Sequence, residues 1–359
     1  MSDRKMLVAM SGGVDSSVAA LLVIKNGYSP IGITMKLYDN EQAGMKDTKT
    51  CCSVKDVDDA RAVAVRLGFP YYVVNFKEGF KEKVIDKFVR TYLDGATPNP
   101  CIDCNRYMKF GALKERAEEY GCEKIVTGHY ARVVYNEELG EYCLLKSVDT
   151  SKDQTYVLYF LNQEQLSYLY LPLGDMTKDE ARVLASEAGL INSDKPDSQD
   201  ICFVPDGNYA RVIEEVLDRH IGEGDFVDKE GNVLGKNKGY YHYTIGQRRG
   251  LGISAAEPLY VIEIIPETNT VVLGSDDDLF TDEVRAAEWN FINKCDAEKD
   301  ELRVTAKIRY RAKEASGILT KEESGIVKVH FDQPVRAVTK GQSLVAYDGE
   351  RVVGGGIII

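Results

Sequence analysis

The chain has 359 residues, of which 44% are apolar and 28% charged, and its formal net charge is −12. This length suits two or three domains, and these proportions are those of ordinary globular proteins. No stretch approaches the ~20 apolar residues of a membrane-spanning helix, and the N-terminal apolar run is too short for a secretory signal. We therefore expect a cytoplasmic protein with no membrane partner.

The first two hundred residues alternate short apolar runs with amphipathic helical patterns. The runs predict strands at 5–10, 31–38, 71–76 and 125–127. Apolar residues at helical spacing predict helices near 14–22, 57–67, 80–92 and 110–120. This alternation predicts βαβ units in a doubly wound parallel sheet, the α/β fold class.

Beyond about Gly222, glycine becomes frequent and helical periodicity fades. Residues 228–232 and 347–350 have the composition of hairpin turns. We expect an α/β catalytic domain at 1–204, a small linking domain at 205–275 and a β-barrel-like domain at 276–359.

A glycine-rich loop lies between the first predicted strand and helix, where a doubly wound sheet binds ligands. It consists of Ala9, Met10, Ser11, Gly12, Gly13, Val14, Asp15 and Ser16. Two glycines allow a tight turn whose N–H groups converge on an anion at the helix N-terminus. Asp15 would repel a bare phosphate, so we expect it to act through Mg²⁺. The loop lacks Gly-Lys-Ser/Thr and is not a Walker A loop; we favour nucleotide binding over a simple connecting turn.

Three of the eight cysteines stand in distinctive segments. Cys101 and Cys104 follow two prolines, so we place them on a loop or in the first helical turn, where the helix N-terminus favours the thiolate. Cys202 precedes a helix that Asp206 or Asn208 can cap. The Cys-x-x-Cys spacing alone leaves four readings open: half of a zinc site, a thioredoxin-like redox pair, an inert pair and catalytic thiols.

Seven motifs in chain order carry a family resemblance. They are Ser-Gly-Gly-Val-Asp-Ser at 11–16, Thr-Pro-Asn-Pro at 97–100 with Cys-Asn at 104–105, Thr-Gly-His-Tyr-Ala-Arg at 127–132, Ser-Lys-Asp-Gln-Thr-Tyr at 151–156, Asp-Ile-Cys-Phe at 200–203, Tyr-Thr-Ile-Gly-Gln-Arg-Arg-Gly-Leu-Gly at 243–252 and Val-Gly-Gly-Gly-Ile-Ile at 353–358. Together they span nearly the whole chain and resemble the tRNA-specific 2-thiouridylase family. The glycine-rich loop resembles the PP-loop of the ATP-pyrophosphatase superfamily, which makes the predicted fold PP-loop or HUP-like.

The resemblance implies a sulfur-insertion reaction on tRNA. ATP with Mg²⁺ would bind the loop, Met35 and Gly128 and adenylate the C2 oxygen of the wobble uridine in the tRNAs for Lys, Glu and Gln. Cys202 matches the persulfide-bearing cysteine, whose terminal sulfur, or hydrosulfide freed from it, displaces AMP. Cys104 matches the nucleophile that resolves the persulfide and leaves a Cys104–Cys202 disulfide. A cysteine desulfurase or a sulfur-relay protein would supply the sulfur.

A rival chemistry uses the same residues. Some family members carry Asp at the position of Cys101, whereas this chain has Cys-x-x-Cys. Three thiolates, Cys101, Cys104 and Cys202, can hold a 4Fe–4S cluster with an open iron that binds sulfide. We favour the persulfide relay.

An acidic chain needs local basic patches to bind RNA. Alternation from 304 to 311 predicts that Lys307, Arg309, Arg311 and Lys313 share one strand face. Such a face is by itself more typical of solvated surface than of an RNA contact. The resemblance implies that Arg309 and Tyr310 contact tRNA. It implies the same for Asn99, Pro100, Cys101, His129, Lys152, Asp153, Gln154 and Gln342.

Two other functions stay open from the sequence. One is a PP-loop ligase that forms an amide or amidine on a small metabolite and needs neither paired reactive cysteines nor an all-β domain. The other is a non-catalytic tRNA-binding or iron–sulfur scaffold protein, which tRNA-dependent release of AMP and pyrophosphate would exclude.

Overall fold

A five-stranded sheet forms the centre of the N-terminal part of the chain. The computed structural model describes residues 4–38, 54–196, 201–218, 220–322 and 324–359. Every neighbouring pair of strands in this sheet is parallel. In spatial order the strands are β3 (Tyr71–Asn75), β2 (Ser29–Lys36), β1 (Lys5–Ala9), β4 (Lys124–Val126) and β7 (Leu169–Tyr170). The predicted parallel sheet is confirmed, with β7 as an additional edge strand.

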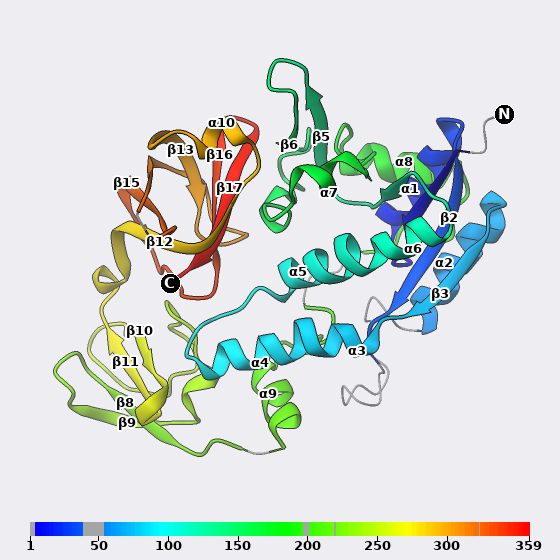
Figure 1. Cartoon of the computed structure of the whole chain (residues 1–359). Coiled ribbons are helices and arrows are strands. Elements are labelled where there is room, and N and C mark those ends of the chain that lie inside the picture. The colour runs from blue at the N-terminus through cyan, green and yellow to red at the C-terminus, as the bar shows by residue number, and fades with distance from the viewer. Residues whose placement is uncertain (1–3, 39–53, 197–200, 219, 323) are drawn as a thin grey trace.

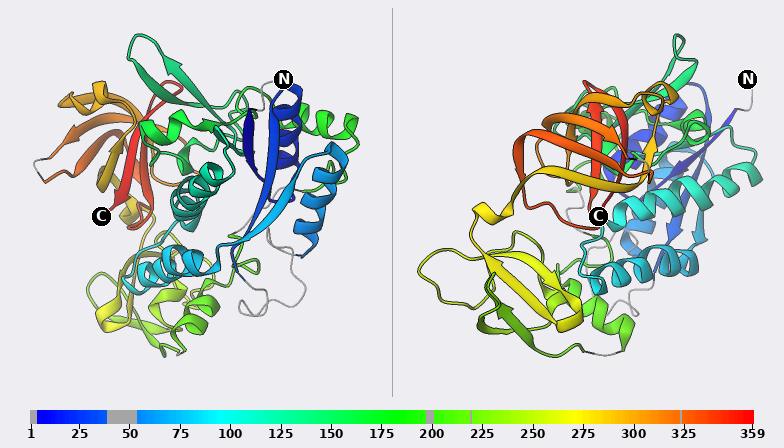
Figure 2. Two further views of the ribbon diagram at one scale, coloured as in Figure 1. Left: turned by 45° about the vertical axis from the view of Figure 1, so that its right-hand side comes forward. Right: turned by 60° about the vertical axis from the view of Figure 1, so that its left-hand side comes forward.

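Helices cover both faces of this sheet (Figures 1 and 2). The helices of one face are α1 (Val14–Lys25), α2 (Val54–Leu67) and α8 (Lys178–Glu187). In β1, Met6 and Val8 pack into the cluster with these helices, while Leu7 packs into the cluster of the opposite face. Because successive strand side chains point to opposite faces, a strand covered on both sides must be apolar throughout. This is why the strand sequences are continuous apolar runs.

Two long helices run along the opposite face, and each contains a π-helical segment. The 77–93 helix consists of α3 (Lys77–Phe80), η1 (Lys81–Ile85) and α4 (Asp86–Leu93). The 100–119 helix consists of α5 (Pro100–Asp103), η2 (Cys104–Ala112) and α6 (Leu113–Glu119). Pro100 is its first residue, where a missing N–H costs nothing because that N–H has no partner within the helix. The helix thus begins well before Phe110, from which its apolar spacing predicts it.

The linking region consists of one helix and a small sheet. Helix α9 (Tyr209–Leu217) begins after Asn208, whose side chain accepts a hydrogen bond from Arg211 N, as predicted. The strands of the sheet, in spatial order, are β10 (Tyr260–Ile265), β11 (Thr270–Gly274), β8 (Gly224–Val227) and β9 (Val233–Asn237). The short 3-10 turns here are η4 (Tyr240–His242) and η5 (Pro266–Thr268). The predicted hairpin turn at 228–232 joins β8 to β9.

The C-terminal strands form a closed antiparallel barrel. Its strands are β12 (Phe280–Phe291), β15 (Val327–Arg336), β14 (Ala315–Lys321), β13 (Glu301–Lys307), β16 (Ser343–Asp348) and β17 (Arg351–Ile358). The pairing of β12 with β17 closes the ring. The short helices η6 (Asp277–Leu279) and α10 (Lys294–Ala297) flank β12. The predicted hairpin at 347–350 joins β16 to β17, and the predicted fold class is confirmed.

The predicted basic strand face is wrong. Strand β13 ends at Lys307, and the chain then turns through residues 308–312. Arg309, Arg311 and Lys313 are exposed on this connection and share no strand face with Lys307. The apolar–polar alternation continues past the strand because Ile308 is buried beneath the turn.

One hairpin of the α/β region belongs structurally to the barrel. Strands β5 (Ala131–Asn136) and β6 (Glu141–Lys146) extend the barrel sheet through the pairing of Leu145 with Arg351. The short helices η3 (Thr155–Val157) and α7 (Gln163–Ser167) follow. The domain limits at 204 and 275 stay a prediction. Within the described parts of the chain, no helix combines the length and apolar character that crossing a membrane requires.

Candidate active site

The glycine-rich loop connects β1 to α1 at the carboxyl end of the sheet. Gly12 has a φ of +75°, and a Cβ there would lie 2.2 Å from Asp56 O, so only glycine fits. Ser16 Oγ and Ser17 Oγ donate to Gly13 O at 3.1 and 3.0 Å. Gly13 has no side chain to cap the helix, which leaves first-turn N–H groups available for an anion. The loop therefore has the backbone geometry that binding of a phosphate at a helix N-terminus requires.

Asp15 forms a partly buried ion pair that the sequence does not reveal. Lys178 Nζ lies 2.7 and 2.8 Å from the two carboxylate oxygens of Asp15, and the Lys178 side chain is 7% exposed. Tyr130 Oη donates to Asp15 Oδ1 at 2.9 Å. This pair fixes α8 beside the loop. Binding of Mg²⁺ by Asp15 stays a prediction. It would require one carboxylate oxygen of Asp15 to release Lys178 Nζ and to bind the ion instead.

Met35 and Gly128 flank the loop from neighbouring strands. Met35 is buried on β2, next to β1. Gly128 follows β4, and a Cβ there would lie 2.7 Å from the backbone of Asp15 and 2.8 Å from Ser16 N. The glycine allows the chain to pass directly against the start of α1. Both residues thus lie around the phosphate loop, as a nucleotide site there requires.

The cysteine-bearing segments lie on the opposite face of the sheet from α1. Cys101 is exposed in the first turn of the 100–119 helix, as predicted, and Cys104 begins its π-helical segment. Cys104 and Cys202 are half-buried and both pack against the same apolar cluster. Tyr38 Oη, just beyond the end of β2, donates to Cys202 O at 2.8 Å. Convergence of the two sulfur atoms stays a prediction, and Asp200 lies outside the described residues.

The proposed cluster site is not assembled in this conformation. In the described ranges, no three His, Cys, Asp or Glu side chains stand close enough to hold a metal ion, and these ranges include Cys101, Cys104 and Cys202. The described cysteines are not joined to one another by disulfides.

Tyr310 connects the barrel to residues 153–156, and it lies near Cys101. Its hydroxyl donates to Asp153 O at 3.4 Å, and its ring lies 5.9 Å from that of Tyr156. Burial raises the pKa of Tyr310, and the nearby charges of Asp153 and Cys101 add to the shift. Tyr310, Asp153 and Cys101 are thus neighbours, although they come from three distant parts of the chain.

Gln342 bonds the backbone just before the cysteines. Its Nε2 donates to Thr97 O at 3.0 Å and to Pro98 O at 3.2 Å. Thr97 N in turn donates to Lys340 O at 2.8 Å. The side chain implied to contact tRNA therefore joins the barrel to the segment that leads into Asn99 and Pro100.

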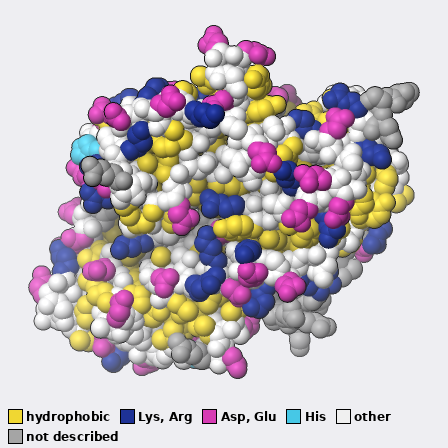
Figure 3. Space-filling view, in the orientation of Figure 1, with side chains coloured by type: hydrophobic (Ala, Val, Ile, Leu, Met, Phe, Trp, Pro, Cys, Tyr) yellow, Lys and Arg dark blue, Asp and Glu magenta, His cyan; other side chains and the backbone are white. Residues whose placement is uncertain are grey.

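The remaining residues predicted to contact RNA come from several separate segments of the chain. His129 is buried with its Nδ1 2.7 Å from Thr127 Oγ1, and burial lowers its pKa well below the usual value. Gln154 Oε1 accepts from Tyr130 N at 3.0 Å. Lys152 is half-buried, and Arg309 is exposed. Figure 3 shows Lys and Arg side chains gathered near the middle of one face, between the barrel and the long helices.

Sequence reasoning missed Lys178, Asn192 and Lys195, which all contact the phosphate loop or its first helical turn. Asn192 Nδ2 and Lys195 Nζ each donate to Gly12 O at 3.0 Å. The one local signal was Thr177 followed by Glu180, a capping box that places Lys178 at the start of α8. For Asn192 and Lys195 no local pattern marks the contact, because their partners lie far away in the sequence.

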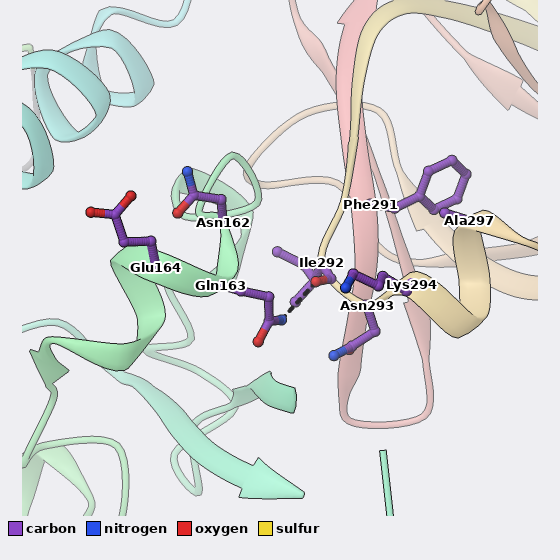
Figure 4. Close-up of a pocket in the computed structure, with 8 residues that line it drawn as sticks. All are labelled: Asn162, Gln163, Glu164, Phe291, Ile292, Asn293, Lys294 and Ala297. Atoms are coloured by element: carbon purple, nitrogen blue, oxygen red, sulfur yellow. Dashed lines mark hydrogen bonds between the residues drawn. The ribbon is translucent and has the colours of Figure 1, made fainter. Parts of the chain in front are cut away.

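A separate surface pocket of about 380 Å³ lies between α7 and the start of the barrel (Figure 4). Gln163 Nε2 donates to Ile292 O and Tyr142 O, both at 2.8 Å. Asn293 Nδ2 donates to Tyr142 O at 3.0 Å. These amides tie α7 and the hairpin to the barrel, and the pocket is lined by none of the predicted site residues.

Three family models match successive parts of the chain. The tRNA methyl transferase HUP domain matches residues 4–206, the tRNA methyl transferase PRC-barrel domain 211–275 and the aminomethyltransferase beta-barrel domain 281–358. The fold and the loop thus define a PP-loop protein of the HUP class with two further β domains.

Curated relatives match over the full length. The tRNA-specific 2-thiouridylase MnmA of Clostridioides difficile is 51% identical over 356 residues, 99% of this chain and 98% of that protein. The protein of the same name from Acetivibrio thermocellus is 51% identical over 359 residues, 100% of both. The solved U34-tRNA thiolase NcsA from Methanococcus maripaludis, with its 4Fe-4S cluster, is 18% identical at a TM-score of 0.35, in a match that covers 61% of this chain and 74% of that chain. The chain belongs to the tRNA-specific 2-thiouridylase family, whose members are tRNA sulfurtransferases.

Proposed function

We propose that the protein replaces the C2 oxygen of the wobble uridine with sulfur in the tRNAs for Lys, Glu and Gln. ATP binds the phosphate loop, and the uridine C2 oxygen attacks the α-phosphorus, so that pyrophosphate leaves and AMP stays on the oxygen. The terminal sulfur of a Cys202 persulfide then attacks C2 and displaces AMP. Cys104 thiolate attacks the Cys202 sulfur, which breaks the S–S bond, releases the 2-thiouridine and leaves a Cys104–Cys202 disulfide. A dithiol reductant and a new sulfur from a desulfurase or relay protein complete the cycle.

One observation carries this proposal: the carboxyl ends of neighbouring parallel strands bear the parts it needs. The phosphate loop follows β1, and the Tyr38 hydroxyl that binds the Cys202 backbone follows β2. Gly128 and His129 follow β4, and the His129 ring lies 5.8 Å from Phe110 of the helix that carries Cys104. Ligands of open α/β sheets bind at this edge. Adenylation and sulfur transfer at one site are therefore compatible with the fold.

Single-turnover thiolation with matched cysteine variants tests the proposal. Cys202→Ser and Cys104→Ser should abolish 2-thiouridine formation while tRNA-dependent pyrophosphate release persists, because adenylation needs no thiol. Cys122→Ser is the control, since burial raises the pKa of Cys122 to about 11 and keeps it a thiol. Full formation of 2-thiouridine by the Cys202→Ser protein would contradict the proposal.

Anaerobic purification with iron analysis separates the two sulfur chemistries. The relay predicts thiolation without stoichiometric iron and partial activity for Cys101→Asp. If activity requires iron, and if Cys101→Asp loses both the iron and the activity, cluster-bound sulfide would be the sulfur source in place of the persulfide relay.

A further inference from the structure

Lys178 holds its ammonium group against the first turn of α1. Its Nζ lies 2.7 and 2.8 Å from the two carboxylate oxygens of Asp15, and its side chain is 7% exposed. Asp15 is the second residue of α1. An anion that binds the N–H groups at the start of this helix lies beside that residue, so Lys178 is close to the place where nucleotide phosphates would bind.

The start of α8 fixes the backbone of Lys178. Thr177 and Glu180 form a capping box around it, and Lys178 N donates to Asp149 Oδ2 at 3.1 Å. One turn later, Ala181 packs into the same apolar cluster as α1. The lysine therefore needs little further ordering when an anion arrives, and a pre-organised charge is the kind that contributes most to catalysis.

Asp15 has a second donor that does not depend on Lys178. Tyr130 Oη donates to Asp15 Oδ1 at 2.9 Å, and the ring centre of Tyr130 lies 5.8 Å from Lys178 Nζ. The Asp15 side chain is 31% exposed, against 7% for that of Lys178. The carboxylate thus keeps a hydrogen bond and access to water if the ammonium turns to another anion.

Adenylation would increase the negative charge beside this ammonium. As the uridine oxygen attacks the α-phosphorus, the bond from that phosphorus to the bridging oxygen breaks, and its electron pair leaves with pyrophosphate. A cation beside the leaving group therefore stabilises the transition state more than the bound ATP. Coulomb attraction also grows with charge, so a multiply charged pyrophosphate competes well with the single charge of Asp15 for Lys178.

We propose that Lys178 is a further catalytic residue of the adenylation step, whose ammonium passes from Asp15 to the oxygens of the departing pyrophosphate. This inference rests on the proposed function, since it takes the glycine-rich loop as the place where pyrophosphate leaves. Lys178 acts through its charge and its N–H donors and transfers no proton. Asp15 acts as a competitor that holds the ammonium until the anion replaces it.

Binding of inorganic pyrophosphate to the full-length protein, measured by calorimetry in EDTA and without tRNA, tests this contact. Asp15→Asn should bind pyrophosphate about tenfold more tightly than the wild type, because the competing carboxylate is gone. The double variant Asp15→Asn/Lys178→Met should bind it about tenfold more weakly than Asp15→Asn, and Lys178→Arg in the same background should restore part of the affinity. The double variant replaces both charges of the ion pair, so no buried charge is left unpaired to unfold it.

Lys25→Met in the Asp15→Asn background is the matched control. Lys25 is exposed in the last turn of α1, so its substitution removes the same charge at the far end of the same helix. It should leave the affinity for pyrophosphate within about twofold of that of Asp15→Asn, because salt screens charges at that separation. If Lys178 only neutralises Asp15, then Asp15→Asn and the double variant bind equally well. That result would overturn the inference, as would the absence of pyrophosphate binding by Asp15→Asn.

Single-turnover release of pyrophosphate from ATP in the presence of tRNA gives a second readout. Lys178→Met should lower the rate constant at saturating ATP by about 100-fold, because the charge that it stabilises develops in the transition state. The ATP concentration that gives half the maximal rate should change less. An unchanged rate constant would contradict a catalytic role. The calorimetric titration needs neither tRNA nor sulfur, so Lys178-dependent binding of pyrophosphate by a protein that does not thiolate tRNA would contradict the proposed function alone.

Discussion

Buried polar side chains near the phosphate loop have their protonation state set by their neighbours. His129 is 7% exposed and shares a hydrogen bond with Thr127 Oγ1. Loss of hydration lowers the pKa of His129 well below 6.5, and the charge of Lys109 adds to the effect. The imidazole is therefore neutral at physiological pH and serves as a hydrogen-bonding group.

We expect the free energy of unfolding to decrease as the pH falls from 7 to 5. In this range the unfolded chain protonates His129 near its usual pKa of 6.5, while the folded protein keeps it neutral, so the unfolded state binds more protons. One such group contributes a slope of at most about 1.4 kcal/mol per pH unit. His129→Asn should reduce the slope of the unfolding free energy against pH, measured by urea unfolding at pH 5, 6 and 7.

His330 provides the control for this prediction. It is exposed on β15, so His330→Asn should leave the pH dependence unchanged. Burial also lowers the pKa of His242, so part of the slope should remain in the His129 variant. An identical slope in wild type and His129→Asn would contradict the assignment.

The role of a single residue can be predicted from the sequence when the residues that it contacts are near it in the chain. Gly12 was recognisable because its neighbours in the chain form the motif. The contacts of Lys178 with Asp15 and of Lys195 with Asp56 join residues that are 163 and 139 positions apart. Such pairs follow from the packing of α8 and α2 around α1, which local patterns do not encode.

The start of the 100–119 helix is held by the barrel. Gly341 has a φ of +84°, and a Cβ there would lie 3.0 Å from Thr97 O. This close approach lets Gln342 reach the Thr97 and Pro98 carbonyls. The turn before Cys101 is thereby fixed from outside its own domain.

Gln342→Ala should lower the free energy of unfolding by about 1–2 kcal/mol, because two hydrogen bonds to backbone carbonyls are lost. Lys340→Ala is the control: its side chain is exposed and only its backbone is used, so a change within about 0.5 kcal/mol is expected. Denaturant unfolding without tRNA measures both. If Gln342 served only as a tRNA contact, the two variants would be equally stable.

Element boundaries were less predictable than the elements themselves. The alternation through residue 311 reflects burial of Ile308 beneath a turn, and periodicity alone does not show where backbone pairing stops. The 100–119 helix begins at a proline that sequence rules associate equally with loops and with first helical residues. In both cases tertiary contacts determine the residue at which the strand ends or the helix begins.

At the scale of the whole molecule, the sheet was predictable and its assembly with the barrel was not. Parallel strands with intervening helices follow from runs such as residues 5–10. The pairing of β6 with β17 joins a hairpin of the α/β region to the C-terminal strand, and its sequence shows no sign of that partner. Cys101, Asp153 and Tyr310 become neighbours only through this assembly.

Binding of tRNA by a chain of net charge −12 must depend on where its cations lie. Arg309 is exposed on the turn after β13, next to Tyr310, which contacts Asp153. We expect Arg309→Glu to weaken tRNA binding and to reduce by about one the slope of the logarithm of affinity against the logarithm of salt concentration. Affinity for an ATP analogue should be unchanged, because the phosphate loop lies on a different element. Filter binding at several salt concentrations measures the slope.

Arg303→Glu is a matched control for this prediction. Arg303 lies on the same barrel strand region, is exposed and is paired with Asp332. Both substitutions change the net charge by two units, so any general repulsion of RNA is the same in the two proteins. If Arg309 contacts tRNA directly, only the Arg309 variant should lose tRNA affinity and salt dependence. Equal losses of affinity in the two variants would assign the effect to net charge. Loss of analogue binding in Arg309→Glu would make the turn a structural element of the active site.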